Sequence, residues 1–161
     1  MSPWWGPRPA AGRRRVVISQ PSGPNFRVPG LGRARVQATQ LAKAFGSEVT
    51  AVYVLDPYPF TGVGADFAYG QAQYLSAATA EANKALEDVQ QLMDKEGVAV
   101  KTMIGEGHAV HESVVRIGQT VGADLLVMGS SGRSGLQKLG LGSVAQRVLQ
   151  TAHVPVLVVR D

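Results

Sequence analysis

The sequence contains no cysteine, so disulfide bonds and thiolate metal sites are excluded. No apolar run approaches the roughly 18 residues that a membrane span needs, and residues 1–12 lack the apolar core of a secretory signal. We therefore expect a cytoplasmic protein with no membrane partner. The 161 residues are enough for one domain with a sizeable core.

Acidic residues are absent from the first part of the chain. Residues 1–35 contain seven arginines and no acid, whereas residues 36–161 hold nine basic and twelve acidic residues. The net charge of +4 therefore belongs to the first segment. Arg13-Arg14-Arg15 could contact nucleic acid, but no aromatic-interleaved basic face or RNA-binding signature accompanies it. We expect a flexible basic arm at 1–13 that binds no nucleic acid, and a domain at 14–161 with an atypical first strand and loop at 14–35.

The distribution of apolar residues predicts alternating strands and helices. Short β-rich runs predict the strands, and apolar residues at helical spacing predict the helices. The expected strands are Arg15–Ser19, Val49–Leu55, Val98–Ile104, Leu125–Met128 and Val154–Val159, and the expected helices are Arg33–Phe45, Ala72–Glu96, Val110–Val121 and Ser143–Thr151. This order predicts an α/β fold with a doubly wound, five-stranded parallel sheet and helices on both faces. Ligands of such sheets bind outside the carboxyl ends of the strands.

A glycine-rich segment follows the fourth expected strand and leads into the last expected helix. Its pattern is Gly129-x-x-Gly132-x9-Gly142-Ser143. Glycines let the backbone approach a phosphate closely, and helix N-termini bind anions. The pattern is neither a Walker P-loop nor the dinucleotide-binding fingerprint. We interpret the segment as a phosphate or nucleotide cradle. The alternative is a long turn in which the glycines only allow the backbone conformation.

The segment and its flanks resemble the signature of the ATP-binding branch of the universal stress proteins. The matching stretches are Ala123–Gly129, Gly132–Gly135, Leu141–Ala145 and Val154–Val159, within a resemblance that covers residues 36–161. The resemblance implies a Rossmann-like sheet of strand order 3-2-1-4-5, ATP as the ligand with or without Mg²⁺, and a homodimer formed through the last strand. It also implies a nucleotide-responsive stress or regulatory factor, with slow ATP hydrolysis or autophosphorylation at most.

The resemblance assigns a set of residues to the nucleotide site. The ribose and phosphate end comprises Met128, Gly129, Ser131, Gly132, Gly142, Ser143 and Val144. Val54 on the second strand would meet adenine through its backbone. Gln20 stands where the family has an Asp near adenine and ribose, and it can hydrogen-bond but supplies no carboxylate. This departure leaves open a dimeric interaction module with an impaired or empty nucleotide site.

Polar residues outside the signature leave two further interpretations open. His108 and His111 lie three residues apart near a helix start, where they could bind a metal with Glu106 or Glu112. The simpler interpretation is a polar first turn of the helix. Asp124 precedes the fourth strand at its amino end, away from the ligand edge, so we expect it to have a structural role.

Overall fold

The chain folds into a five-stranded parallel sheet in the order β3-β2-β1-β4-β5, as the sequence predicts. The computed structural model describes residues 15–20, 29–56, 64–130 and 140–160. The elements are β1 Arg15–Gln20, α1 Pro29–Phe45, β2 Glu48–Leu55, α2 Ala65–Lys95, β3 Val100–Glu106, α3 Val110–Thr120, β4 Leu125–Gly129, α4 Ser143–Thr151 and β5 Val156–Val159.

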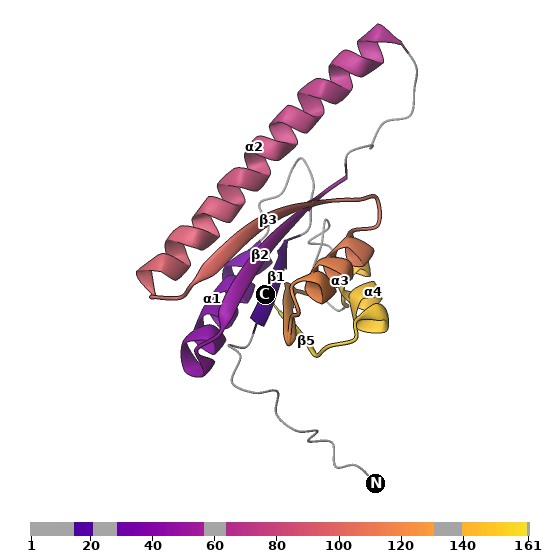
Figure 1. The fold of residues 1–161 in the computed structure, drawn as a ribbon. Helices are drawn as coiled ribbons and strands as arrows, with labels where there is room; N and C mark the ends of the chain where they lie inside the picture. Colours follow the sequence, from indigo (N-terminus) through magenta and orange to yellow (C-terminus); the bar gives the residue numbers. More distant parts are fainter. Residues whose placement is uncertain (1–14, 21–28, 57–63, 131–139, 161) are drawn as a thin grey trace.

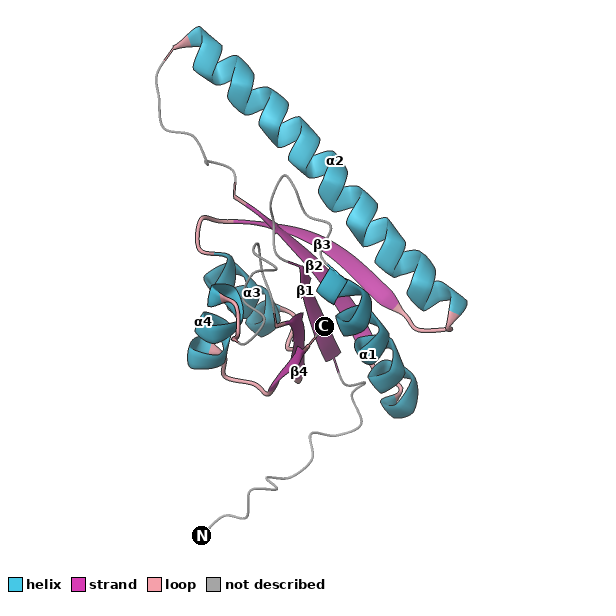
Figure 2. Cartoon of the chain, turned by 180° about the vertical axis from the view of Figure 1, so that it is seen from behind, coloured by secondary structure: helices cyan, strands magenta, loops and turns pink. Residues whose placement is uncertain are grey.

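Helices cover both faces of the sheet (Figures 1 and 2). α1 and α2 pack on one face, and α3 and α4 pack on the other. Because successive side chains of a strand point to opposite faces, β1 contributes Val16 and Ile18 to the core under α1 and α2, and Val17 to the core under α3 and α4. The central strands β1, β2 and β4 are buried on both faces, which explains why they are nearly continuous apolar runs.

Two helices begin earlier than the sequence predicts. α1 starts at Pro29 rather than Arg33, since proline fits the first turn of a helix, where its missing N–H is not needed. α2 starts at Ala65 rather than at Ala72, so the predicted start of this helix is wrong by about two turns. Gly70 is accommodated within this helix because one glycine costs only about 1 kcal/mol there.

Small residues form the buried face of α1. Ala34, Ala38 and Ala42 are almost completely buried and bring the helix close to the sheet. The larger apolar residues Val36 and Phe45 of the same helix are 42% and 60% exposed. The apolar spacing therefore predicted the helix, and the alanines rather than the largest apolar residues form its buried face.

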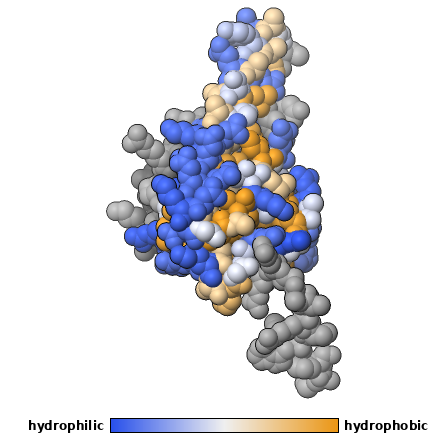
Figure 3. Space-filling model, turned by 60° about the vertical axis from the view of Figure 1, so that its left-hand side comes forward, coloured by the Kyte–Doolittle hydropathy of each residue, from blue (hydrophilic) through white to orange (hydrophobic). Residues whose placement is uncertain are grey.

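Only the second half of α2 packs on the sheet. Its buried residues are Ala82, Leu86, Val89 and Met93, while its first half projects past the end of the sheet in Figure 1. Viewed from the α2 side, apolar surface remains exposed beside the base of this helix (Figure 3). None of the described helices combines the length and the apolar character needed to cross a membrane.

The amino edge of the sheet is held by a contact between β1 and the start of β4. The N–H of Arg15 donates to the Asp124 carboxylate at 2.9 Å, and the N–H of Asp124 donates to the Arg15 carbonyl at 2.8 Å. The Arg15 guanidinium also donates to the carbonyl of Val121. These bonds give Asp124 the structural role expected from its position.

Candidate functional site

The end of β4 and the start of α4 are joined by hydrogen bonds. The N–H of Gly142 donates to the carbonyl of Ser130 at 2.7 Å, and the N–H of Ser130 donates to the carbonyl of Val159 in β5 at 2.9 Å. Ser130 is 8% exposed. Gly129, the last residue of β4, and Gly142 therefore lie close together at the carboxyl edge of the sheet, although residues 131–139 separate them in the chain.

Among the described residues, no side chain caps the N-terminus of α4. Gly142 is its N-cap, has no side chain to make a capping hydrogen bond, and is followed by a first turn without an acidic residue. Most helices satisfy their first N–H groups with a Ser, Thr, Asp or Asn at the N-cap and place acids in the first turn. Ser143 is exposed and Val144 is half-buried, so the open positive end of the helix is accessible at the carboxyl edge.

Two buried strand residues from the predicted set lie under this edge. Val54 of β2 is fully buried and Met128 of β4 is 5% exposed, and both belong to the apolar cluster under α3 and α4. β1 runs between these two strands, and Gln20, its last residue, pairs in register with Tyr53 of β2. The structure thus brings the ends of β1, β2 and β4 to one edge, as a site between them requires.

A second turn closes the same edge beside β2. The N–H of Gly107 donates to the Leu55 carbonyl at 2.9 Å, and His108 Nδ1 lies 2.8 Å from Asp56 Oδ1. Gly105 lies close to α3, since a Cβ there would be 2.8 Å from Ile117 Cδ1. These contacts were not predicted from the sequence, although Gly105-Glu106-Gly107 at the end of β3 indicates a close approach of the backbone.

The arrangement of the histidines favours a polar turn over a metal site. His108 pairs with Asp56, whereas His111 Nε2 lies 3.9 Å from Glu112 Oε1. Within residues 15–20, 29–56, 64–130 and 140–160, no group of three or more His, Asp or Glu residues could hold a metal ion. Of the predicted nucleotide-binding residues, Ser131 and Gly132 lie outside the described residues.

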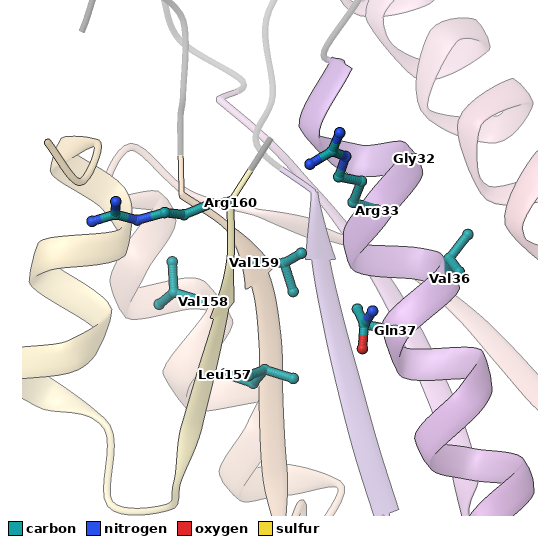
Figure 4. Close-up of a pocket in the computed structure, with 8 residues that line it drawn as sticks. All are labelled: Gly32, Arg33, Val36, Gln37, Leu157, Val158, Val159 and Arg160. Carbon is teal, nitrogen blue, oxygen red and sulfur yellow. The ribbon is translucent and has the colours of Figure 1, made fainter. Parts of the chain in front are cut away.

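A separate hollow lies on the opposite side of the sheet end, between α1 and β5 (Figure 4). It has a volume of about 580 Å³ and is lined from α1 by Gly32, Arg33, Val36 and Gln37, and from the β5 side by Leu157, Val158, Val159 and Arg160. The half-buried residues of β5 form the outer edge of the sheet. This hollow is therefore a groove along the edge strand β5, and none of the predicted nucleotide residues lines it.

Comparisons with known proteins agree with this architecture. The family model described as the universal stress protein family matches residues 31–160. The chain belongs to this family. Universal stress protein MJ0531 of Methanocaldococcus jannaschii is 40% identical over 128 residues, which is 79% of this chain and 73% of that protein.

Solved structures of the family share the fold. The universal stress protein UspA from Lactobacillus plantarum superposes with a TM-score of 0.76 at 22% identity, over 92% of this chain and all of that one. The universal stress protein from Archaeoglobus fulgidus, solved in complex with dAMP, gives a TM-score of 0.63 at 20% identity, over 91% of this chain and 97% of that one. At these identities the likeness shows the shared Rossmann-like α/β fold.

Proposed function

We propose that this universal stress protein binds ATP at the carboxyl edge of its sheet and acts as a nucleotide-responsive stress or regulatory factor. The single observation that carries the proposal is the start of α4. Its N-cap, Gly142, is held against Ser130 at the end of β4, and its first turn has neither a side-chain cap nor an acid. Such a helix end favours a bound anion.

The predicted site residues have plausible roles in this proposal. The N–H groups of Ser143 and Val144 would donate to phosphate oxygens, together with the Ser143 hydroxyl, while Gly129 leaves space for the backbone to approach the ligand. The backbone of Val54 would meet adenine, and Met128 would lie at the ribose and phosphate end of the site. The Archaeoglobus protein solved with dAMP supports an adenine nucleotide as the ligand class.

The described residues at the phosphate end fit a nucleotide better than a dedicated metal site. α4 has no acidic residue in its first turn, so a Mg²⁺ ion would be held chiefly by phosphate oxygens and water. Ser143 makes no hydrogen bond to a described His, Asp or Glu that could act as a base. A general base must lie within hydrogen-bond reach of the attacking group, so we propose nucleotide binding as the primary activity.

Equilibrium titration of the full chain with ATP tests the proposal. We expect saturable binding in the micromolar range that is lost or strongly weakened in Gly142→Val and weakened in Ser143→Ala. Gly142 has φ −61° and ψ 158°, which a residue with a side chain can adopt. A loss of binding in Gly142→Val should therefore occur in a folded protein, which circular dichroism of the same sample would verify.

The edge groove supports a second candidate function, a dimeric interaction module. β5 is an edge strand of the described sheet, and its apolar residues line the groove together with Val36, which is 42% exposed. An exposed apolar edge strand favours pairing with another chain. We propose that a second copy covers this edge.

Sedimentation equilibrium tests the dimer. The wild type should have the mass of a dimer, and Val36→Asp should shift it towards the monomer. Phe45→Asp is the matched control, because Phe45 lies at the other end of α1 and outside the groove. A wild-type mass that stays monomeric at all concentrations would exclude the dimer.

A further inference from the structure

We infer that Arg160 is a further phosphate-binding residue of this protein and recognises the charged end of the nucleotide. The inference rests on the proposed function and names a contact that the glycine-rich signature does not include. Arg160 follows β5 directly, at the carboxyl edge of the sheet. Its position relative to α4 follows from the backbone bonds, the alternation of β5 and the charges around it.

The backbone places Arg160 beside the start of α4. Val159, its neighbour, pairs in register with Gly129 and accepts the 2.9 Å hydrogen bond from the N–H of Ser130. Ser130 in turn accepts the 2.7 Å bond from Gly142, the N-cap of α4. Two hydrogen bonds and one peptide unit therefore connect Arg160 to the helix end where the phosphates are proposed to bind.

The side chain of Arg160 lies on the same face of the sheet as α4. In β5, Leu157 and Val159 pack in the core under α1 and α2, whereas Val156 and Val158 pack in the core under α3 and α4. Because successive side chains of an extended strand point to opposite faces, the Arg160 side chain lies on the same face as that of Val158. Figure 4 agrees, because the Arg160 side chain points towards the α4 side and away from α1.

The charge of Arg160 is not neutralised by a described neighbour. Arg160 is exposed and forms no ion pair or hydrogen bond with a described residue. α4 itself carries no acid that could pair with it, since its only charged residue is Arg147. A guanidinium next to an open helix N-terminus creates a positive site that suits phosphate oxygens.

Arg33 provides a matched control. It lines the same groove as Arg160 and is also exposed, but it comes from α1 on the other face of the sheet. The substitutions Arg33→Gln and Arg160→Gln remove the same charge, so a general loss of positive potential would affect both variants equally. A direct contact of Arg160 with the phosphates would instead make ATP affinity fall in Arg160→Gln and not in Arg33→Gln.

The experiment compares ATP with uncharged adenosine by titration of the full chain. Arg160→Gln should weaken ATP binding about tenfold or more, because charge-assisted hydrogen bonds to phosphate are strong. Adenosine binding should stay within about twofold, and Arg33→Gln should leave ATP binding within about twofold. Arg160→Lys should recover part of the loss, since it restores the charge without the planar guanidinium.

Three outcomes would overturn the inference. ATP binding by Arg160→Gln equal to that of the wild type, or an equal loss for ATP and adenosine, would show that Arg160 does not contact the phosphates and would leave the proposed function intact. A loss of ATP affinity that accompanies a change from dimer to monomer, measured by sedimentation, would assign Arg160 to the subunit contact instead. A wild type that binds neither ATP nor adenosine would remove the proposed function and the inference together.

Discussion

The N–H of Gly142 donates a 2.7 Å hydrogen bond to the carbonyl of Ser130. This bond brings the first residue beyond β4 against the N-cap of α4, so the glycine-rich segment begins and ends at one point of the sheet edge. Ser130 is anchored in turn to β5. The position of the α4 N-terminus relative to the strand ends is therefore set by backbone bonds, independently of the side chains within the segment.

Gly105 should tolerate a methyl group only if its neighbour becomes smaller. A Cβ at this position would lie 2.8 Å from Ile117 Cδ1 and 3.6 Å from Val54 Cγ2. We expect Gly105→Ala to lower the free energy of unfolding by about 1–3 kcal/mol through overpacking. Urea denaturation measures the change.

Ile117→Val removes the clashing methyl group and serves as the control for Gly105→Ala. Alone it should cost about 0.5–1.5 kcal/mol. The double variant should lose less free energy of unfolding than the sum of the two single losses, because the two methyl groups compete for one space. Strict additivity would show that the close packing of α3 on β3 does not explain the glycine.

Asp124 should contribute to stability without affecting the nucleotide site. Its carboxylate accepts the N–H of Arg15 at 2.9 Å on the amino edge of the sheet. We expect Asp124→Ala to lower the free energy of unfolding by about 0.5–1.5 kcal/mol, and Asp124→Asn, which keeps an acceptor oxygen, to cost less. ATP affinity should be the same in the wild type and in both Asp124 variants. A weakened affinity in Asp124→Ala would show that the amino edge of the sheet is coupled energetically to the nucleotide site at the carboxyl edge.

The pair Lys43–Glu96 should make stability depend on pH in the acid range. Lys43 Nζ donates to Glu96 Oε2 at 2.7 Å, and this hydrogen bond, with the lysine charge, lowers the pKa of Glu96. A carboxyl with a lowered pKa in the folded state stabilises the fold above its unfolded pKa, which is about 4.3 for Glu. The contribution is lost as the pH falls through the folded pKa.

Lys43→Gln should therefore be less stable than the wild type near neutral pH, and the difference should vanish in acid. Both side chains are about half exposed, so the effect should be small and should decrease with added salt. Lys84→Gln, an exposed lysine on α2 outside the ion pairs of the described residues, is the control. A stability difference for Lys43→Gln that persists unchanged to low pH would contradict the assignment.

The fold was predictable because the central strands β1, β2 and β4 are buried on both faces. Continuous apolar runs such as Val49–Leu55 are typical of parallel sheets. Their alternation with helices limits the possible topologies of the sheet to a few. The core-facing side of α1 was not predictable from spacing. Three alanines form that face, whereas the larger apolar residues Val36 and Phe45 are exposed.

The candidate site was only partly predictable. A glycine pattern before a helix indicates a phosphate end through local chain geometry, and this pattern is the reason for predicting Gly129, Gly142 and Ser143. The contact of Asp56 with His108 joins segments distant in the chain, and so does the direction of the Arg160 side chain towards α4. No local pattern encodes such contacts, because they depend on strand order and register.

The central claim, that the uncapped start of α4 binds the phosphates of ATP, is tested most directly by isothermal titration of the full chain. The prediction is saturable binding of one ATP per chain with micromolar affinity, lost in Gly142→Val and unchanged in Asp124→Ala. Absence of binding by the folded wild type up to millimolar ATP, or retention of wild-type affinity in Gly142→Val, would contradict it.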